Sequence, residues 1–265
     1  MNFPVIEMFT SIQGEGKWTG SPSFFVRVSG CNLRCCFKGS ICDTPYSSYN
    51  PEKTPYKSMQ ELVVAFKKMQ EENPNVKHLV ITGGEPLLYK NGLDEFLTNV
   101  YEDDMVVTIE TNGTLEPLNA FSEKYMIDLY SVSPKLSTSV GEANGLLTDG
   151  QVKQHNKTRI NIDNLCKYVL NSIDYQFKFV YSGKECIDEI EDIYDRMKQH
   201  LEDDEGKLED FLDYHPDNHT MLMPEGITNE QLAKSRIECA EMCVKKGWDY
   251  TDRTHIIIWG DKRGV

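Results

Sequence analysis

Apolar residues along the chain gather in short runs that alternate with longer amphipathic segments. The short runs predict strands; they cover residues 23–28, 77–81, 105–110, 127–132, 177–180, 220–223 and 254–259. The amphipathic segments predict helices, and two of them begin with residues typical of a helix cap, Ser58 before Glu61 and Thr228 before Gln231. The predicted helices cover residues 58–72, 92–101, 162–170, 186–201 and 228–246.

Strands that alternate with helices indicate βα units and a parallel sheet. About six such units are too few to close an eight-stranded barrel, so we expect an α/β fold with an open, partial TIM-like barrel. Its site should lie at the carboxyl ends of the strands. We expect one domain over residues 1–265, with insertions near 137–157, a polar glycine-containing loop, and near 202–218, which begins with an acidic, solvated stretch.

Composition and charge narrow the classes of function. Hydrophobic residues make up 39% and charged residues 26% of the 265, which is typical of a globular protein, and the net charge of −14 argues against a nucleic-acid surface. No apolar run approaches the length of a membrane span, and the first residues lack a signal-peptide pattern. We therefore expect a cytoplasmic protein without a membrane partner, in which thiols stay reduced.

Four of the eight cysteines cluster directly after the strand at 23–28: Cys31, Cys35, Cys36 and Cys42. Several thiolates on one short loop can hold an iron–sulfur cluster. A zinc site or buried free thiols are the alternatives, although zinc normally requires a fourth ligand at a fixed spacing. The cysteines alone leave these interpretations open.

The segments that flank the cysteines are more selective. They are Ser11–Gly16 (SIQGEG), Phe25–Arg27 (FVR), Cys42–Thr44 (CDT), Thr82–Pro86 (TGGEP), Glu110–Gly113 (ETNG), Ser133–Lys135 (SPK) and the tail from His255 through Trp259 to Val265. With them the chain resembles the 7-carboxy-7-deazaguanine synthases, a family of radical S-adenosylmethionine (SAM) enzymes. Their usual cluster spacing is Cys-x3-Cys-x2-Cys, whereas here four additional residues separate the second and third ligands. The resemblance implies Cys31, Cys35 and Cys42 as ligands of a [4Fe–4S] cluster, with Cys36 as the alternative to Cys35.

The resemblance also implies residues for three further ligands. Mg²⁺ would bind Thr44. SAM would bind Gly84, Glu85, Ser133, Pro134, Lys135, Met223, Pro224, Glu225 and Gly226. The pterin substrate would contact Ile12, Gln13, Gly14, Arg27, Thr82, Glu110 and His255. The glycines at 83 and 84 are expected to let the backbone approach SAM.

The implied activity is that of a lyase, which converts 6-carboxy-5,6,7,8-tetrahydropterin to 7-carboxy-7-deazaguanine with loss of ammonia, a step toward queuosine-type 7-deazapurines. A reductant such as flavodoxin or ferredoxin and a homodimer are implied as well. Two other interpretations remain: an activase that forms a glycyl radical on a partner protein, and a zinc-stabilised binding module.

Overall fold

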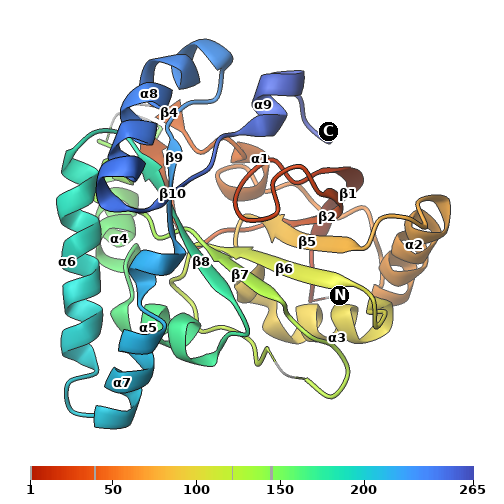
Figure 1. The fold of residues 1–265 in the computed structure, drawn as a ribbon. Coiled ribbons are helices and arrows are strands. Elements are labelled where there is room, and N and C mark those ends of the chain that lie inside the picture. Colours follow the sequence, from red (N-terminus) through yellow and green to blue (C-terminus); the bar gives the residue numbers. More distant parts are fainter. Residues whose placement is uncertain (1, 39, 121, 144–145) are drawn as a thin grey trace.

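A computed structural model describes residues 2–38, 40–120, 122–143 and 146–265. One sheet runs through it in the order β1, β2, β5, β6, β7, β8, β9, β10 (Figure 1). Its strands are β1 (Val5–Ile12), β2 (Pro22–Val28), β5 (His78–Gly83), β6 (Val106–Thr111), β7 (Leu129–Val132), β8 (Tyr175–Tyr181), β9 (Thr220–Pro224) and β10 (Asp249–Tyr250). In the described part of this sheet only the β1–β2 pair is antiparallel. Within the described residues β1 and β10 are the two edges, so the barrel is open, as predicted.

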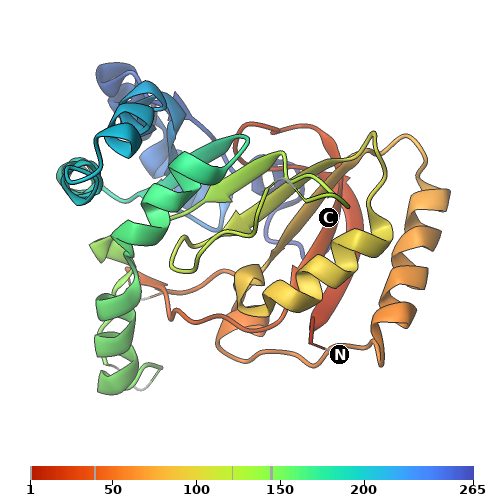
Figure 2. The same ribbon diagram turned by 90° about the horizontal axis from the view of Figure 1, so that it is seen from below.

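Helices follow most strands and cover the outer face of the sheet (Figures 1 and 2). The longer ones are α2 (Met59–Glu72), α3 (Lys90–Val100), α4 (Asp149–Thr158), α5 (Ile162–Asn171), α6 (Glu185–His200), α7 (Glu205–Asp213) and α8 (Asn229–Lys246). Short helices are α1 (Pro45–Ser48), α9 (Thr254–Trp259) and the 3₁₀ turns η1 (Pro86–Tyr89), η2 (Ser137–Ser139) and η3 (Pro216–His219). Among the described residues, no helix combines the length and apolar character that a membrane span needs.

Aromatic side chains join the sheet to its helical layer. Phe24 of β2 meets Phe66 of α2 edge-on, with ring centroids 5.5 Å apart, and Phe66 meets Phe96 of α3 in the same way at 5.4 Å. All three rings are buried. Such pairs stabilise a core beyond the area that they bury, and here they join β2 to α2 and α3.

Polar side chains line up across the sheet on its other face. Arg27 of β2 lies opposite Thr82 of β5, and Glu110 of β6 lies opposite Ser131 of β7, which is opposite Gln176 of β8. Side chains alternate between the two faces of a strand, so this register collects the polar residues of separate strands in one place. The interior of the partial barrel is therefore polar near the carboxyl ends.

Two expectations about elements are wrong, and one helix was not predicted. Residues 254–259, predicted as the last strand, form helix α9, because β10 already occupies the sheet edge and Thr254 N–H instead bonds Gly14 O at 2.9 Å. Residues 149–158, predicted as loop, form α4, which begins with a capping box between Thr148 and Gln151. Residues 205–213, predicted as part of a solvated acidic stretch, are mostly exposed, as expected, but they form helix α7, which buries Phe211.

Candidate active site

A cavity of about 930 Å³ opens at the carboxyl ends of the parallel strands. It brings together nearly all of the predicted site residues. Its lining includes Ile12, Gln13, Gly14, Arg27, Cys31, Cys35, Cys42, Thr44, Thr82, Gly84, Glu110, Ser133, Lys135, Met223, Pro224, Glu225, Gly226 and His255. Glu85 and Pro134 are the two predicted residues that do not line it.

The irregular spacing of the cysteines has a simple structural basis. Two short antiparallel strands lie between Cys35 and Cys42, β3 (Cys36–Phe37) and β4 (Ser40–Ile41), with Cys36 opposite Ile41; we call this strand pair the hairpin. The Cys42 N–H bonds Cys35 O at 3.0 Å and closes the hairpin, so the two thiol-bearing residues stay neighbours despite the extra length. Cys36 is 2% exposed and does not line the cavity.

The three cavity-lining thiols are buried or half-buried. Burial raises the pKa of Cys31 to about 11, and burial raises the pKa values of Cys35 and Cys42 above their usual range as well. Without metal the thiols are therefore protonated, and iron would have to displace these protons on binding. No three His, Cys, Asp or Glu side chains of the described residues converge as ligands of one ion would. In a [4Fe–4S] cluster each thiolate binds its own iron, so such convergence is not required.

Asparagine side chains hold the loop that carries Cys31. Asn112 Nδ2 donates to Asn32 Oδ1 at 2.9 Å and lies 3.9 Å from the Cys31 sulfur. Asn32 Nδ2 in turn donates to Thr114 Oγ1 at 2.7 Å. The segment after β6 therefore positions the cysteine loop, a role that sequence analysis did not assign to it.

Glu85, predicted to bind SAM, is surrounded by protein donors. Its carboxylate is fully buried and accepts hydrogen bonds from Leu87 N at 3.0 Å, Thr111 Oγ1 at 2.9 Å and Asn112 N at 2.8 Å. The carboxylate thus joins β5 to β6 and does not reach the cavity.

Gly84 is required by protein packing. A Cβ at Gly84 would lie 2.0 Å from the carbonyl oxygen of Gly30, so the glycine lets the cysteine loop approach β5. Gly84 also lines the cavity, so the expectation that it lets the backbone approach SAM stays a prediction.

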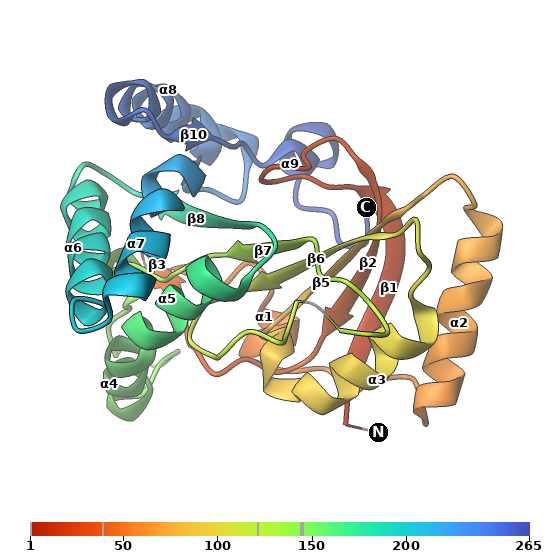
Figure 3. The same cartoon turned by 60° about the horizontal axis from the view of Figure 1, so that its bottom comes forward.

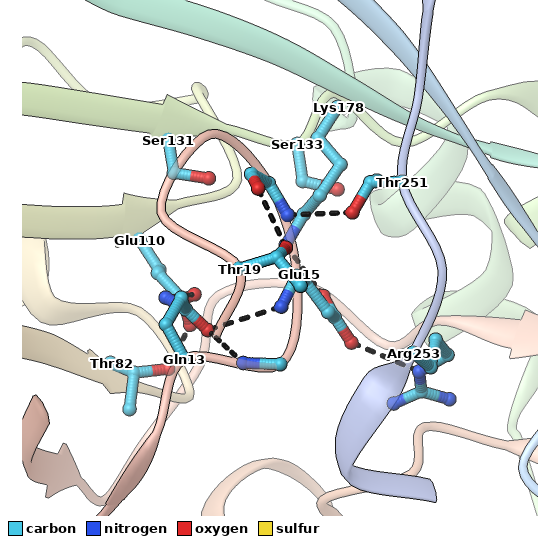
Figure 4. Close-up of polar contacts among 12 residues, drawn as sticks. Gln13, Glu15, Thr19, Thr82, Glu110, Ser131, Ser133, Lys178, Thr251 and Arg253 are labelled. Atoms are coloured by element: carbon cyan, nitrogen blue, oxygen red, sulfur yellow. Dashed lines mark hydrogen bonds and ion pairs between the residues drawn. The ribbon is translucent and has the colours of Figure 1, made fainter. Parts of the chain in front are cut away.

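Four of the predicted substrate residues, Gln13, Gly14, Thr82 and Glu110, share one hydrogen-bond cluster (Figure 4). Glu110 accepts from Gln13 Nε2 at 3.2 Å and from Thr82 Oγ1 at 2.6 Å. Gln13 Oε1 accepts the Gly14 N–H at 2.8 Å, which fixes the loop after β1. Arg27 Nε donates to Glu7 at 2.5 Å, so this mid-strand charge has the buried partner that its position requires.

An ionic network lies beside these residues and was missed. Its Glu15, Lys178 and Arg253 side chains are largely buried (Figure 4), whereas the side chain of Asp43 is 38% exposed. Lys178 donates to Glu15 at 2.6 Å, and Arg253 donates to Glu15 at 2.9 Å and to Asp43 at 2.5 Å. Burial disfavours the charge on Glu15, but Lys178 and Arg253 outweigh it and hold the pKa of Glu15 well below its usual range. The sequence did contain one indication of this network. Lys178 lies in the middle of the apolar run at 177–180, and a buried charge needs a partner.

Lys135 and Thr44, which were predicted to bind SAM and Mg²⁺, have polar contacts with residues near them in sequence. The Lys135 ammonium donates to Ser133 Oγ at 2.7 Å. The Thr44 hydroxyl is 3.4 Å from the Cys42 sulfur and 3.4 Å from Asp43 Oδ1. Burial lowers the pKa of His255, on α9, and favours its neutral imidazole. The site therefore combines thiols, one hydroxyl near them, and polar groups of both charges.

Comparisons with known proteins agree with this site. Residues 25–197 match the radical SAM superfamily. The chain is 34% identical over 263 residues to the 7-carboxy-7-deazaguanine synthase of Halobacterium salinarum (97% of this chain, 91% of the relative) and 35% identical over 261 residues to that of Rhodopirellula baltica (98% and 88%). QueE from Escherichia coli has the same fold, with a TM-score of 0.58 at 22% identity over 96% of this chain and 94% of that one. These matches favour the synthase interpretation over the activase and the zinc module. The chain belongs to the radical SAM superfamily and, within it, to the 7-carboxy-7-deazaguanine synthase family.

Proposed function

We propose that this chain converts 6-carboxy-5,6,7,8-tetrahydropterin to 7-carboxy-7-deazaguanine and ammonia, as a lyase that uses a [4Fe–4S] cluster, SAM and Mg²⁺. The observation that carries the proposal is that three thiols and the Gln13–Thr82–Glu110 cluster line one cavity at the strand ends. Sites of this fold lie at that edge, and the relatives that match over nearly the whole chain carry this enzyme name.

Cys31, Cys35 and Cys42 would hold the cluster. They line the cavity, whereas Cys36 is turned out of it by the hairpin. When bound, the cluster would chelate SAM and supply the electron that cleaves it. The protein's own contribution is to keep the loop fixed through Asn32 and Asn112.

SAM would lie along the ends of β7 and β9. The Lys135 ammonium and Ser133 hydroxyl would receive its carboxylate and ribose, and the segment at 223–226 would contact the adenosine. Glu85 would instead position the cysteine loop through Asn112, because its carboxylate is fully buried and does not line the cavity, in contrast to that of Glu110.

The Thr44 hydroxyl would be a Mg²⁺ ligand. Mg²⁺ commonly takes one or two protein oxygens and completes its shell with water and substrate oxygens. Asp43 Oδ1, 3.4 Å from that hydroxyl, adds negative charge nearby.

The pterin substrate would bind through polar groups at its two ends, the ring N–H and amino groups at one end and the carboxylate at the other. Glu110 can accept hydrogen bonds from ring N–H and amino groups, with Gln13 and Thr82 holding its orientation. The guanidinium of Arg27, held at Nε by Glu7, would meet the substrate carboxylate. In this assignment the Glu110 carboxylate binds the N–H end of the substrate and the Arg27 cation binds its carboxylate end.

The test is to reconstitute the protein with iron and sulfide under anaerobic conditions and to supply SAM, reductant, Mg²⁺ and the carboxypterin. We expect a new ultraviolet-absorbing deazapurine and one ammonia for each product molecule. A protein that takes up iron and cleaves SAM but leaves the pterin unchanged would overturn the substrate assignment.

Glu110→Gln tests how the substrate is read. The amide replaces one acceptor oxygen by a donor, so we expect the KM for the carboxypterin to rise at least about tenfold. Reductive SAM cleavage without pterin should stay at the wild-type rate, since Glu110 is not assigned to SAM. Equal KM values in the two proteins would exclude Glu110 from substrate binding.

The remaining parts of the proposal concern the setting of the enzyme. We propose a reductant such as flavodoxin or ferredoxin, a homodimer, a cytoplasmic location, and one radical SAM domain over residues 1–265 with insertions near 137–157 and 202–218. Comparison of turnover with each electron donor, and the mass of the protein in solution, test the first two.

A further inference from the structure

The segment from η2 to α4, which includes the polar stretch predicted as an insertion, packs directly on the cysteine loop. Gly141 lies against Cys36: a Cβ on this glycine would be 2.6 Å from the Cys36 Cβ and 2.9 Å from its sulfur. Figure 3 shows α4 and β3 at the same end of the molecule. The outward-turned face of the hairpin is therefore covered by this segment.

His155 of α4 makes the polar contact between the two segments. The backbone N–H of Arg34, between Cys31 and Cys35, donates to His155 Nδ1 at 3.2 Å. His155 is 2% exposed, and burial lowers its pKa to about 4, so the imidazole is neutral near pH 7. Nδ1 therefore accepts, and the ring proton is on Nε2.

The second ring nitrogen, Nε2, links His155 through Ser139 to the segment predicted to bind SAM. Ser139 Oγ donates to Leu136 O at 2.6 Å and lies 3.0 Å from His155 Nε2, so it accepts the Nε2 proton. Leu136 directly follows Lys135, whose carbonyl accepts from Arg159 at 3.0 Å. Arg159 lies just after α4 and is paired with Glu189 at 2.6 Å.

We propose that His155 is a positioning residue that fixes the backbone between two cluster cysteines relative to the segment at 133–135. The inference rests on the proposed function, because that function makes the first segment the cluster loop and the second the SAM site. A neutral histidine suits the role: it accepts on one side and donates on the other, so both buried groups are satisfied.

Three substitutions at His155 distinguish its bond from Arg34 from its bond to Ser139. His155→Asn places an amide oxygen near the Nδ1 position and can keep the bond from Arg34, whereas His155→Gln places an amide nitrogen near Nε2 and can keep the bond to Ser139. His155→Phe fills similar space and loses both bonds.

His78 provides the matched control. It is 6% exposed, burial lowers its pKa to about 4, and its two ring nitrogens each lie 2.8 Å from a hydroxyl, Ser23 Oγ and Thr108 Oγ1. It begins β5, at the end of the strands opposite the cavity. His78→Phe therefore matches the loss of two buried bonds without touching the cysteine loop.

The first measurement needs no cluster. In cluster-free protein we expect amide hydrogen exchange at Arg34 to be at least about tenfold faster in His155→Phe and His155→Gln than in wild type and His78→Phe, because the N–H has lost its acceptor. His155→Asn should restore most of the protection.

The second measurement uses the reconstituted protein. We expect iron release to a chelator to be about tenfold faster, and the KM for SAM several-fold higher, in His155→Phe than in His78→Phe. If wild type forms no iron–sulfur cluster, the proposed function fails. If wild type forms one and the Arg34 exchange rates match in the two phenylalanine variants, the inference about His155 is overturned while the function stands.

Discussion

Several charged side chains in this site are held in place by ion pairs with one another. Glu15 takes one cation on each oxygen, Lys178 and Arg253, and Arg253 also donates to Asp43 and to the carbonyl of Gly226 at 2.7 Å. Burying a charge is costly unless it is paired. These four side chains therefore hold the loop after β1, the end of the cysteine loop and the start of α9 in one arrangement.

At this scale the ligand choice between two adjacent cysteines can be tested. Cys35→Ala should lose the cluster, and Cys36→Ala should keep about four irons per chain, the content of one [4Fe–4S] cluster. The reason is that Cys35 lines the cavity while Cys36 packs against Gly141.

Iron analysis and the absorbance of the reconstituted proteins check this result. Cys166→Ala, a buried thiol on α5 outside the cavity, is the control for losing a thiol as such. Loss of iron in Cys36→Ala together with retention in Cys35→Ala would reverse the assignment.

At the scale of elements, patterns of a few residues predicted most strands and helices, and contacts between distant residues decided the rest. The apolar runs at 23–28 and 77–81 became β2 and β5 within a few residues. The run at 254–259 has the composition of a strand, yet it becomes α9 because residue 14, far away in sequence, binds its first N–H. Likewise the motifs predicted which residues share a cavity, but no spacing could show that Glu85 turns inward or that Arg253 reaches Asp43.

Arg253 anchors α9 to the barrel, and its removal should destabilise the whole chain. Arg253→Ala leaves the largely buried Glu15 with only Lys178 and removes the partner of Asp43, whose side chain is 38% exposed. Because of the Glu15 pair we expect a loss of about 3–5 kcal/mol in the free energy of unfolding.

Arg263 in the tail gives the comparison for that change. It pairs with Glu52 and Glu7, but its side chain is 39% exposed, so Arg263→Ala should cost no more than about 1 kcal/mol. Chemical denaturation of the cluster-free proteins measures both. Equal losses would mean that the ionic network contributes no more than the exposed pairs.

For the whole molecule, stability should depend on pH through histidines that are buried and neutral. Burial lowers the pKa of His78 and of His155 to about 4, whereas an unfolded chain titrates near 6.5. Between these values the unfolded state binds more protons, so lowering the pH favours unfolding. His255, whose pKa burial also lowers, acts in the same direction.

We therefore expect the free energy of unfolding to fall as pH is lowered from about 6.5 toward 4, by up to about 1.4 kcal/mol per pH unit for each of these histidines. The low pKa of Glu15 works with the same sign, but only below about pH 4.5, because an unfolded glutamate is still ionised above it. Urea denaturation of cluster-free protein, with thiols kept reduced, at steps between pH 6.5 and 4.5 measures this dependence. Burial raises the pKa values of Glu85 and Asp128, which act with the opposite sign in this range, so the histidine contributions are taken from the differences between variants and wild type. His78→Gln and His155→Gln should each reduce the slope, and the double variant should lose both contributions, since the two sites are at opposite ends of the strands and independent effects add. A double variant with the wild-type slope would show that neither imidazole is the source.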